Sequence, residues 1–159
     1  MAIHVVVQEK DFDLDEAYNA LRETGGADVG AIVSFVGLVR DRNATAGDGS
    51  QVSTLTLEHY PGMTEASIED IAVQAKERWG LQGLYVCHRI GELLPRDQVV
   101  LVAVSAGHRK EAFAGAEFVM DYLKTDAVLW KKEQTADGSR WIESTVGDRE
   151  RAKAWQDLD

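Results

Sequence analysis

Apolar residues recur with helical spacing in one stretch of the chain, residues 108–124. Its apolar positions lie three or four residues apart along one helix face: Ala112, Phe113, Ala116, Val119, Met120 and Leu123. The stretch opens with His108, Arg109 and Lys110 and closes with Lys124. The pattern therefore predicts an amphipathic helix that buries one stripe and carries cationic side chains at both ends.

Shorter apolar runs elsewhere predict strands. The expected strands are residues 2–8, 28–40, 52–60, 81–91, 98–107, 128–135 and 139–145, and further helices are expected at 13–26 and 64–79. The run 28–40 is apolar on both alternating faces, which predicts a central strand covered on both sides. Because the order mixes helical crossovers with hairpins, it indicates an α+β domain and not a doubly wound sheet.

The length and net charge of the chain limit its domain organisation and its binding partners. A chain of 159 residues fits one domain, which we place at residues 1–146, followed by a charged tail, 147–159, expected to be a loose surface helix. The net charge of -10 disfavours nucleic acid and anionic membranes as partners. No apolar run approaches the roughly 20 residues of a membrane span, and the start of the chain lacks a signal-peptide pattern. We expect a cytoplasmic protein.

Several kinds of chemistry lack their signatures. The single cysteine, Cys87, excludes an internal disulfide and lies in an apolar run, so we expect it to be buried and structural. The four histidines lack the spacing that puts two imidazoles on one helix face, so no metal site is expected. Glycine-rich dinucleotide and P-loop motifs are absent from the sequence, and no cofactor is expected.

The cations at the two ends of the predicted helix are far apart. Lys124 follows His108 by 16 residues, which separates the ends of an unbroken helix by roughly 24 Å. One small ligand cannot touch both, so there are either two sites or one composite site at a two-fold interface. Cations at a helix start are disfavoured by roughly 0.3 to 1 kcal/mol each. Either a bound anion or pairing with Glu111 should offset that cost.

The strand after this helix carries adjacent lysines. Alternation puts Lys131 and Glu133 on one face and Trp130 with Lys132 on the other. Only one lysine can face a site. We expect Lys131, since Leu129 on the same face can help to enclose it, and desolvation would lower its pKa toward use as a general base. Lys132 is expected to be a surface charge.

Six segments of the chain, in order and with similar spacing, resemble the large, catalytic subunit of molybdopterin synthase. They are FVGLVR (35–40), LEHYPGMTE (57–65), HRIGEL (88–93), HRKEAF (108–113), MDYLK (120–124) and WKKE (130–133). The resemblance implies an α+β fold, an α/β-hammerhead-like domain with an additional antiparallel β subdomain. It also implies an enzyme of molybdenum cofactor biosynthesis, a sulfurtransferase that adds two sulfurs to cyclic pyranopterin monophosphate and so forms the dithiolene of molybdopterin.

The resemblance further implies partners. Sulfur would arrive as a thiocarboxylate on the C-terminal glycine of a ubiquitin-like small subunit, whose tail enters a pocket of this chain. Two copies of this chain would form a central dimer with one small subunit at each end, a heterotetramer. This sequence departs from the family in lacking a proline just before Trp130 and in having a somewhat long loop at 41–51. That loop is expected to be mobile, and it is either a passive surface loop or a lid beside the site.

The same resemblance assigns site residues. Lys124 and Lys131 match the two active-site lysines. The remaining matches are expected to bind substrate: Arg40, with His108 and Arg109 from the neighbouring copy, as phosphate and pterin ligands, and Phe35 and Met120 as pocket lining. Two other functions stay open on the sequence: a noncatalytic dimer that binds a phosphorylated metabolite with these cations, and an interaction protein whose groove accepts another chain's tail.

Overall fold

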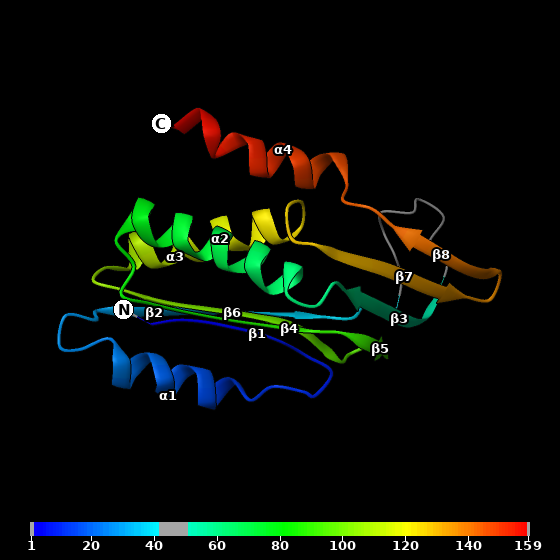
Figure 1. Cartoon of the computed structure of the whole chain (residues 1–159), viewed down its shortest axis with the longest axis horizontal. Helices are drawn as coiled ribbons and strands as arrows, with labels where there is room; N and C mark the ends of the chain where they lie inside the picture. The colour runs from blue at the N-terminus through cyan, green and yellow to red at the C-terminus, as the bar shows by residue number, and fades with distance from the viewer. Residues whose placement is uncertain (1, 42–50, 159) are drawn as a thin grey trace.

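The computed structural model describes residues 2–41 and 51–158, which form two sheets and their covering helices (Figure 1). In chain order the elements are β1 (Ala2–Gln8), α1 (Leu14–Thr24), β2 (Ala31–Leu38), β3 (Val52–His59), α2 (Met63–Trp79), β4 (Gly83–Arg89), β5 (Gly91–Leu93), β6 (Gln98–Ala106), α3 (Arg109–Leu123), β7 (Leu129–Thr135), β8 (Gly138–Ile142), α4 (Val146–Ala154) and the 3-10 helix η2 (Gln156–Leu158). The predicted strands and helices are all found, and β5 is an additional short strand.

The strands divide into two sheets of four. The first has the order β1-β4-β6-β2, with β1 parallel to β4 and the other pairs antiparallel. The second has the order β5-β3-β7-β8 and is antiparallel throughout. Helix α1 covers one face of the first sheet and α2 with α3 the other, while the second sheet extends from one end (Figure 1). The predicted α+β, α/β-hammerhead-like fold with an additional antiparallel β subdomain is confirmed.

The expectation of a central strand at residues 28–40 is wrong. Strand β2 lies at the edge of the first sheet, and β4 and β6 occupy its centre. Phe35 and Leu38 on β2 are 43% and 55% exposed. A continuous apolar run indicates burial on both faces, but strand order depends on distant pairing partners that a local pattern does not contain.

Helix α3 confirms the predicted helix, with His108 as N-cap and Lys124 as C-cap. The predicted stripe is wrong at one position: Phe113 is 62% exposed, whereas Phe118, left out of the stripe, is buried. Helix α3 contacts β6 and β2 on one side and α2 and α4 on others. A helix with neighbours on several sides buries more than one stripe.

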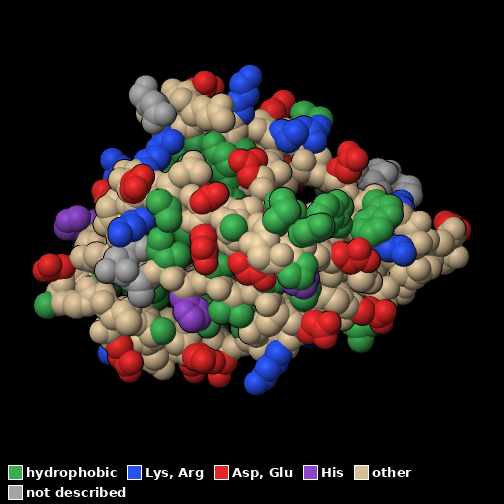
Figure 2. Space-filling model, in the orientation of Figure 1, with side chains coloured by type: hydrophobic (Ala, Val, Ile, Leu, Met, Phe, Trp, Pro, Cys, Tyr) green, Lys and Arg blue, Asp and Glu red, His purple; other side chains and the backbone are tan. Residues whose placement is uncertain are grey.

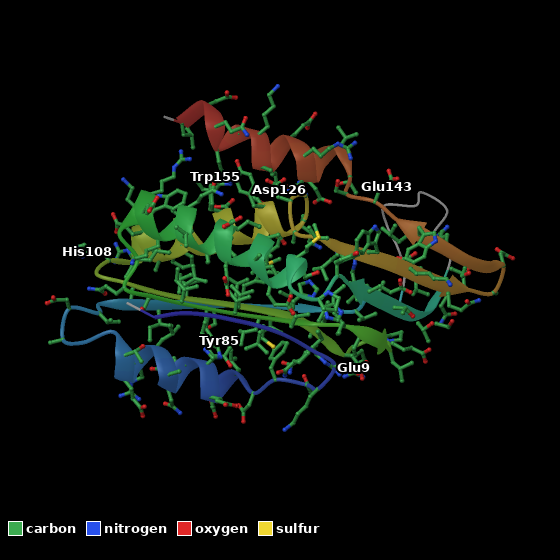
Figure 3. The ribbon with its side chains drawn as sticks, in the orientation of Figure 1. Glu9, Tyr85, His108, Asp126, Glu143 and Trp155 are labelled. Carbon is green, nitrogen blue, oxygen red and sulfur yellow. The ribbon has the colours of Figure 1, made fainter. Side chains whose placement is uncertain are left out.

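The C-terminal helix α4 is not the loose surface helix that was expected. Trp155, just after it, points toward α2 and α3 (Figure 3), and its ring centre lies 5.2 Å from that of Trp79 and 5.7 Å from that of Phe118. Its indole N–H donates to Asp121 Oδ2 at 2.8 Å, and Arg78 donates to its carbonyl at 2.7 Å. These contacts fix α4 on the body of the domain. None of the helices within the described ranges is long and apolar enough to cross a membrane.

Candidate active site

A cavity of about 490 Å³ lies where the second sheet meets the ends of α3 and α4. Figure 2 shows a hollow between the start of α4 and this sheet. Its walls come from the end of β2, from β3, β7 and β8, from the turn after α3 and from the first turn of α4. The volume is typical of a site for a small molecule. Arg40, Lys124 and Lys131 all line it.

A smaller cavity of about 80 Å³ shares the two lysines with the large one. Phe35 and Met120 line it, and so does His88. Five of the seven predicted site residues, from β2, α3 and β7, are therefore brought together in a single copy of the chain: Phe35, Arg40, Met120, Lys124 and Lys131. The predicted loop 41–51 falls mostly outside the described residues.

The turn between the two lysines is fixed by side chains of α2. Buried Thr64 donates through Oγ1 to the carbonyl of Val128 at 2.6 Å and accepts from the N–H of Tyr60 at 2.8 Å. Ser67 Oγ donates to the Thr64 carbonyl at 2.8 Å and accepts from the Val128 N–H at 3.1 Å. Satisfying both backbone groups of Val128 holds the turn in place.

Strand alternation selects Lys131 as the lysine that faces the cavity. Lys131 shares this wall with Leu129 and Glu133, as predicted, whereas Lys132 places its ammonium 5.6 Å from the ring centre of Trp141. Burial, and after it the positive charge of Lys124, lower the pKa of Lys131 to about 8 against the opposing influence of nearby carboxylates. Lys131 thus exchanges a proton close to neutral pH.

Two of the carboxylates that line the large cavity, Glu133 and Asp148, are engaged by arginines. Arg140 Nε lies 3.3 Å from Glu133 Oε2, and Arg151 donates to Asp148 Oδ1 at 2.7 Å. Burial raises the pKa of Asp148, but hydrogen bonds from Thr145 and Arg151, with the charge of Lys124, bring it below its usual value. Within the described ranges neither Lys124 nor Lys131 forms an ion pair closer than 4.0 Å. The lysines therefore remain available to an anionic ligand.

His88 belongs to the site although the sequence analysis passed over it. It is 5% exposed, and its Nδ1 lies 2.9 Å from the carbonyl of Arg89. Burial, helped by the charges of the two neighbouring lysines and opposed by the hydrogen bond to the Arg89 carbonyl, lowers the pKa of His88 to about 4, so the imidazole is neutral at pH 7. Alternation along β4 could have revealed it, because His88 shares with Val86 the face that α3 covers.

Cys87 lies on the opposite face of β4, in the cluster formed with α1. Its side chain is free and 1% exposed. Burial raises the pKa of the Cys87 thiol to about 11. The prediction of a buried, structural cysteine is confirmed, and the thiol is held away from both cavities.

The start of α3 lies away from the cavities. Figure 3 places His108 and Asp126, which follows the helix, at opposite ends of α3. The 15 residues of α3 span roughly 22 Å, and neither His108 nor Arg109 lines either cavity. Both are exposed, and among the residues described Glu111 forms no ion pair with them. Pairing with Glu111 is thus not how these charges are balanced.

The family is decided by comparison with known proteins. A family model described as MoaE protein matches residues 7–126. The chain belongs to the MoaE family. The molybdopterin synthase catalytic subunit of Ralstonia nicotianae is 54% identical over 94% of this chain and 82% of the relative. That of Vibrio cholerae is 52% identical over 96% of this chain and 97% of its own length. This MoaE-family chain is accordingly an enzyme subunit of molybdenum cofactor biosynthesis, the catalytic subunit of molybdopterin synthase.

Solved structures agree with this assignment. The molybdopterin biosynthesis MoaE protein from Burkholderia ambifaria superposes with a TM-score of 0.81 at 45% identity, covering 98% of this chain and 99% of that one. Molybdopterin synthase from Staphylococcus aureus gives a TM-score of 0.74 at 31% identity, covering 87% and 95%. A complex of subunits 1 and 2 of the molybdopterin-converting factor from Helicobacter pylori, 22% identical with a TM-score of 0.64, shares the fold.

Proposed function

We propose that this MoaE-family chain converts cyclic pyranopterin monophosphate to molybdopterin in the cavity beside Lys124 and Lys131, with the thiocarboxylated C-terminus of a ubiquitin-like small subunit as sulfur donor. The observation that carries the proposal is the convergence of Arg40, Lys124 and Lys131, from three separate parts of the chain, on one cavity of about 490 Å³. Cations grouped in this way suit a substrate that carries a cyclic phosphate. A cytoplasmic location stays a prediction of the sequence.

The structure supports different roles for the two lysines. Lys124 is exposed at the C-cap of α3, where the helix dipole favours a cation, and we assign it with Arg40 to holding anionic groups. Lys131 has a pKa of about 8, which suits proton transfer at the carbon that sulfur attacks. In its protonated form it can also neutralise negative charge that develops there.

A second copy of the chain is part of the proposal. His108 and Arg109 cannot reach the cavity of their own chain, so we propose that they complete the cavity of a paired copy as ligands of the phosphate and the pterin. Exposed Phe113, one turn further along α3, supports an interface at this end of the helix. In the assembly that we propose, two copies pair at the centre and one small subunit docks at each end.

The decisive experiment compares Lys131→Ala with Lys132→Ala, a matched lysine on the same strand. Each variant is assayed with the thiocarboxylated small subunit and cyclic pyranopterin monophosphate, and dithiolene product is measured. We expect kcat to fall about 100-fold or more for Lys131→Ala and by less than about 2-fold for Lys132→Ala, which lies outside both cavities.

The same assay separates a catalytic role of Lys131 from a role in binding alone. If Lys131 only binds the metabolite, Lys131→Ala will raise KM and leave kcat unchanged. Equal losses in Lys131→Ala and Lys132→Ala would overturn the assignment of this cavity. Substrate affinity is measured separately by calorimetry, so that weak binding is not mistaken for slow chemistry.

A further inference from the structure

The buried imidazole of His88 lines the small cavity, and one of its two nitrogens contacts the carbonyl of the neighbouring residue, Arg89. A carbonyl oxygen can only accept, so the contact of 2.9 Å between Nδ1 and the carbonyl of Arg89 requires the proton on Nδ1. In the neutral ring Nε2 then carries a lone pair. Among the described residues Nε2 has no hydrogen-bond partner in the protein, while the ring lines the cavity into which both lysines also project.

The cavity has room for water, and its lining can form hydrogen bonds with water. Its volume of about 80 Å³ exceeds the space of about 30 Å³ that a water molecule occupies in the liquid. Its polar side chains are His88, which accepts, and Lys124 and Lys131, which donate. A water here can donate to Nε2 and accept from a lysine ammonium at the same time.

We propose that His88 is a positioning residue for Lys131, acting through one water in the small cavity. The water accepts a hydrogen bond from the Lys131 ammonium and donates one to Nε2 of His88. The carbonyl of Arg89 fixes the tautomer and the ring, as an outer partner does for a metal-bound histidine. His88 thereby stabilises the protonated form of Lys131 and limits where its Nζ can go. The inference rests on the proposed function only for its catalytic consequence.

Other charges also act on Lys131, and they oppose one another. Lys124, at the end of α3, disfavours its protonated form, whereas Asp148 on α4 and Glu133 on β7 favour it. Arg40 and Glu143 line the large cavity that Lys131 faces. Lys124 lines both cavities, whereas the other four charged residues line the large cavity and not the small one. His88 differs from these residues because it supplies a neutral hydrogen-bond acceptor, and it does so from β4 in the first sheet.

The test is the pKa of Lys131 in variants that keep or remove the acceptor. Chains labelled with carbon-13 at lysine Cε are titrated by NMR without partner or substrate, and the Lys131 signal is assigned by its loss in Lys131→Arg. We expect His88→Phe, which removes the acceptor, to lower the pKa of Lys131 by about one unit. We expect His88→Gln, whose Oε1 reaches the place of Nε2, to keep the pKa of Lys131 at about 8.

Two outcomes would overturn the proposal. One is a Lys131 pKa unchanged in folded His88→Phe, and the other is an equal shift in His88→Gln, since a purely structural role would not distinguish the two variants. Should His88→Phe not fold, judged by circular dichroism, His88→Met takes its place, because a thioether is a weak acceptor. The midpoint of the pH profile of turnover should move with the pKa.

This test is separate from that of the proposed function. The titration uses the free chain, so it decides the role of His88 even if Lys131→Ala retains turnover. Conversely, loss of turnover in Lys131→Ala with no shift in His88→Phe would leave the proposed function standing and remove only the positioning role.

Discussion

The two ends of α3 carry cations under opposite conditions. At the C-terminal end Lys124 sits where the helix dipole favours a positive charge, next to two cavities. At the N-terminal end His108, Arg109 and Lys110 sit where the dipole disfavours them, exposed and outside both cavities. The cation at the C-terminal end is stabilised by its own chain. The cations at the N-terminal end would be stabilised by an anionic ligand brought to them.

The two ends of α3 suit the two proposed roles, catalysis at the C-terminal end and ligand binding at the N-terminal end. The C-terminal end is built by long-range contacts: α2 fixes the turn through Thr64, and α4 is fixed by Trp155 and brings Asp148 to the cavity. Such a scaffold suits a reacting lysine that must be held in place. The N-terminal end offers exposed charge with little support, which suits contact with a ligand held by another copy of the chain.

The pH profile of turnover gives the largest expected effect at the C-terminal end. Because the pKa of Lys131 is lowered to about 8, a neutral lysine that takes a proton becomes available only as the pH rises through that value. We expect kcat to reach a plateau above pH 8 and to fall about tenfold per pH unit below it. A kcat that instead declines above pH 8 would assign Lys131 to charge neutralisation. Steady-state turnover from pH 6 to 9.5 measures this.

At the N-terminal end, Arg109→Ala should weaken substrate binding about 10- to 100-fold, the usual loss for a hydrogen bond to a charged group. Stability should not change, because Arg109 is exposed. Lys110→Ala is the matched control: it removes an adjacent exposed cation that was not assigned to the site. Calorimetric titration with substrate measures both. Equal weakening in the two variants would show general attraction in place of a specific ligand role.

Acid stability should report on His88. The folded-state pKa of about 4 lies below the ordinary value of 6.5, so the unfolded chain binds the additional proton first. Proton binding to His88 in the unfolded chain therefore lowers the free energy of unfolding by about 3 kcal/mol as the pH falls from 6.5 to 4, and it has no effect above pH 6.5. Urea unfolding at pH 7 and pH 4.5 should show a smaller loss in His88→Gln than in the parent chain. The same loss in both would exclude His88 as its source, and exposed His4→Gln serves as control.

Thr64→Val keeps the side-chain shape but removes the hydroxyl that joins the turn to α2. The Val128 carbonyl and the Tyr60 N–H lose their partner, which should cost about 1 to 3 kcal/mol in the free energy of unfolding. Turnover should fall while binding at the start of α3 persists. Ser53→Ala, which removes an exposed hydroxyl donating to the Gln134 carbonyl at 3.0 Å, should cost under about 0.5 kcal/mol. Chemical denaturation compares the two.

The spacing of apolar and polar residues predicted the features that depend on neighbouring residues alone. Alternation along residues 130–133 was enough to turn Lys131 inward and Lys132 outward, and helical spacing was enough to place α3. The length of the predicted helix alone was enough to separate its two cationic ends. The catalytic and substrate-binding roles came from the resemblance to a family, and they remain predictions.

What the sequence did not predict depends on contacts between distant segments. The edge position of β2 follows from its pairing with β6 alone in the first sheet as described. The burial of Phe118 and the docking of α4 follow from the aromatic contacts of Trp155. His88 was missed because the histidines were searched for metal spacing, whereas its significance arises only when α3 and β7 bring their lysines over the end of β4.

Mixing two inactive chains tests the central claim most directly. One chain carries His108→Ala with Arg109→Ala, and the other carries Lys131→Ala. If the two ends of α3 serve one cavity across a pair of copies, each mixed dimer holds one intact site, and co-expression should restore roughly a quarter of the parent activity. Activity no higher than that of either variant alone would contradict the composite site.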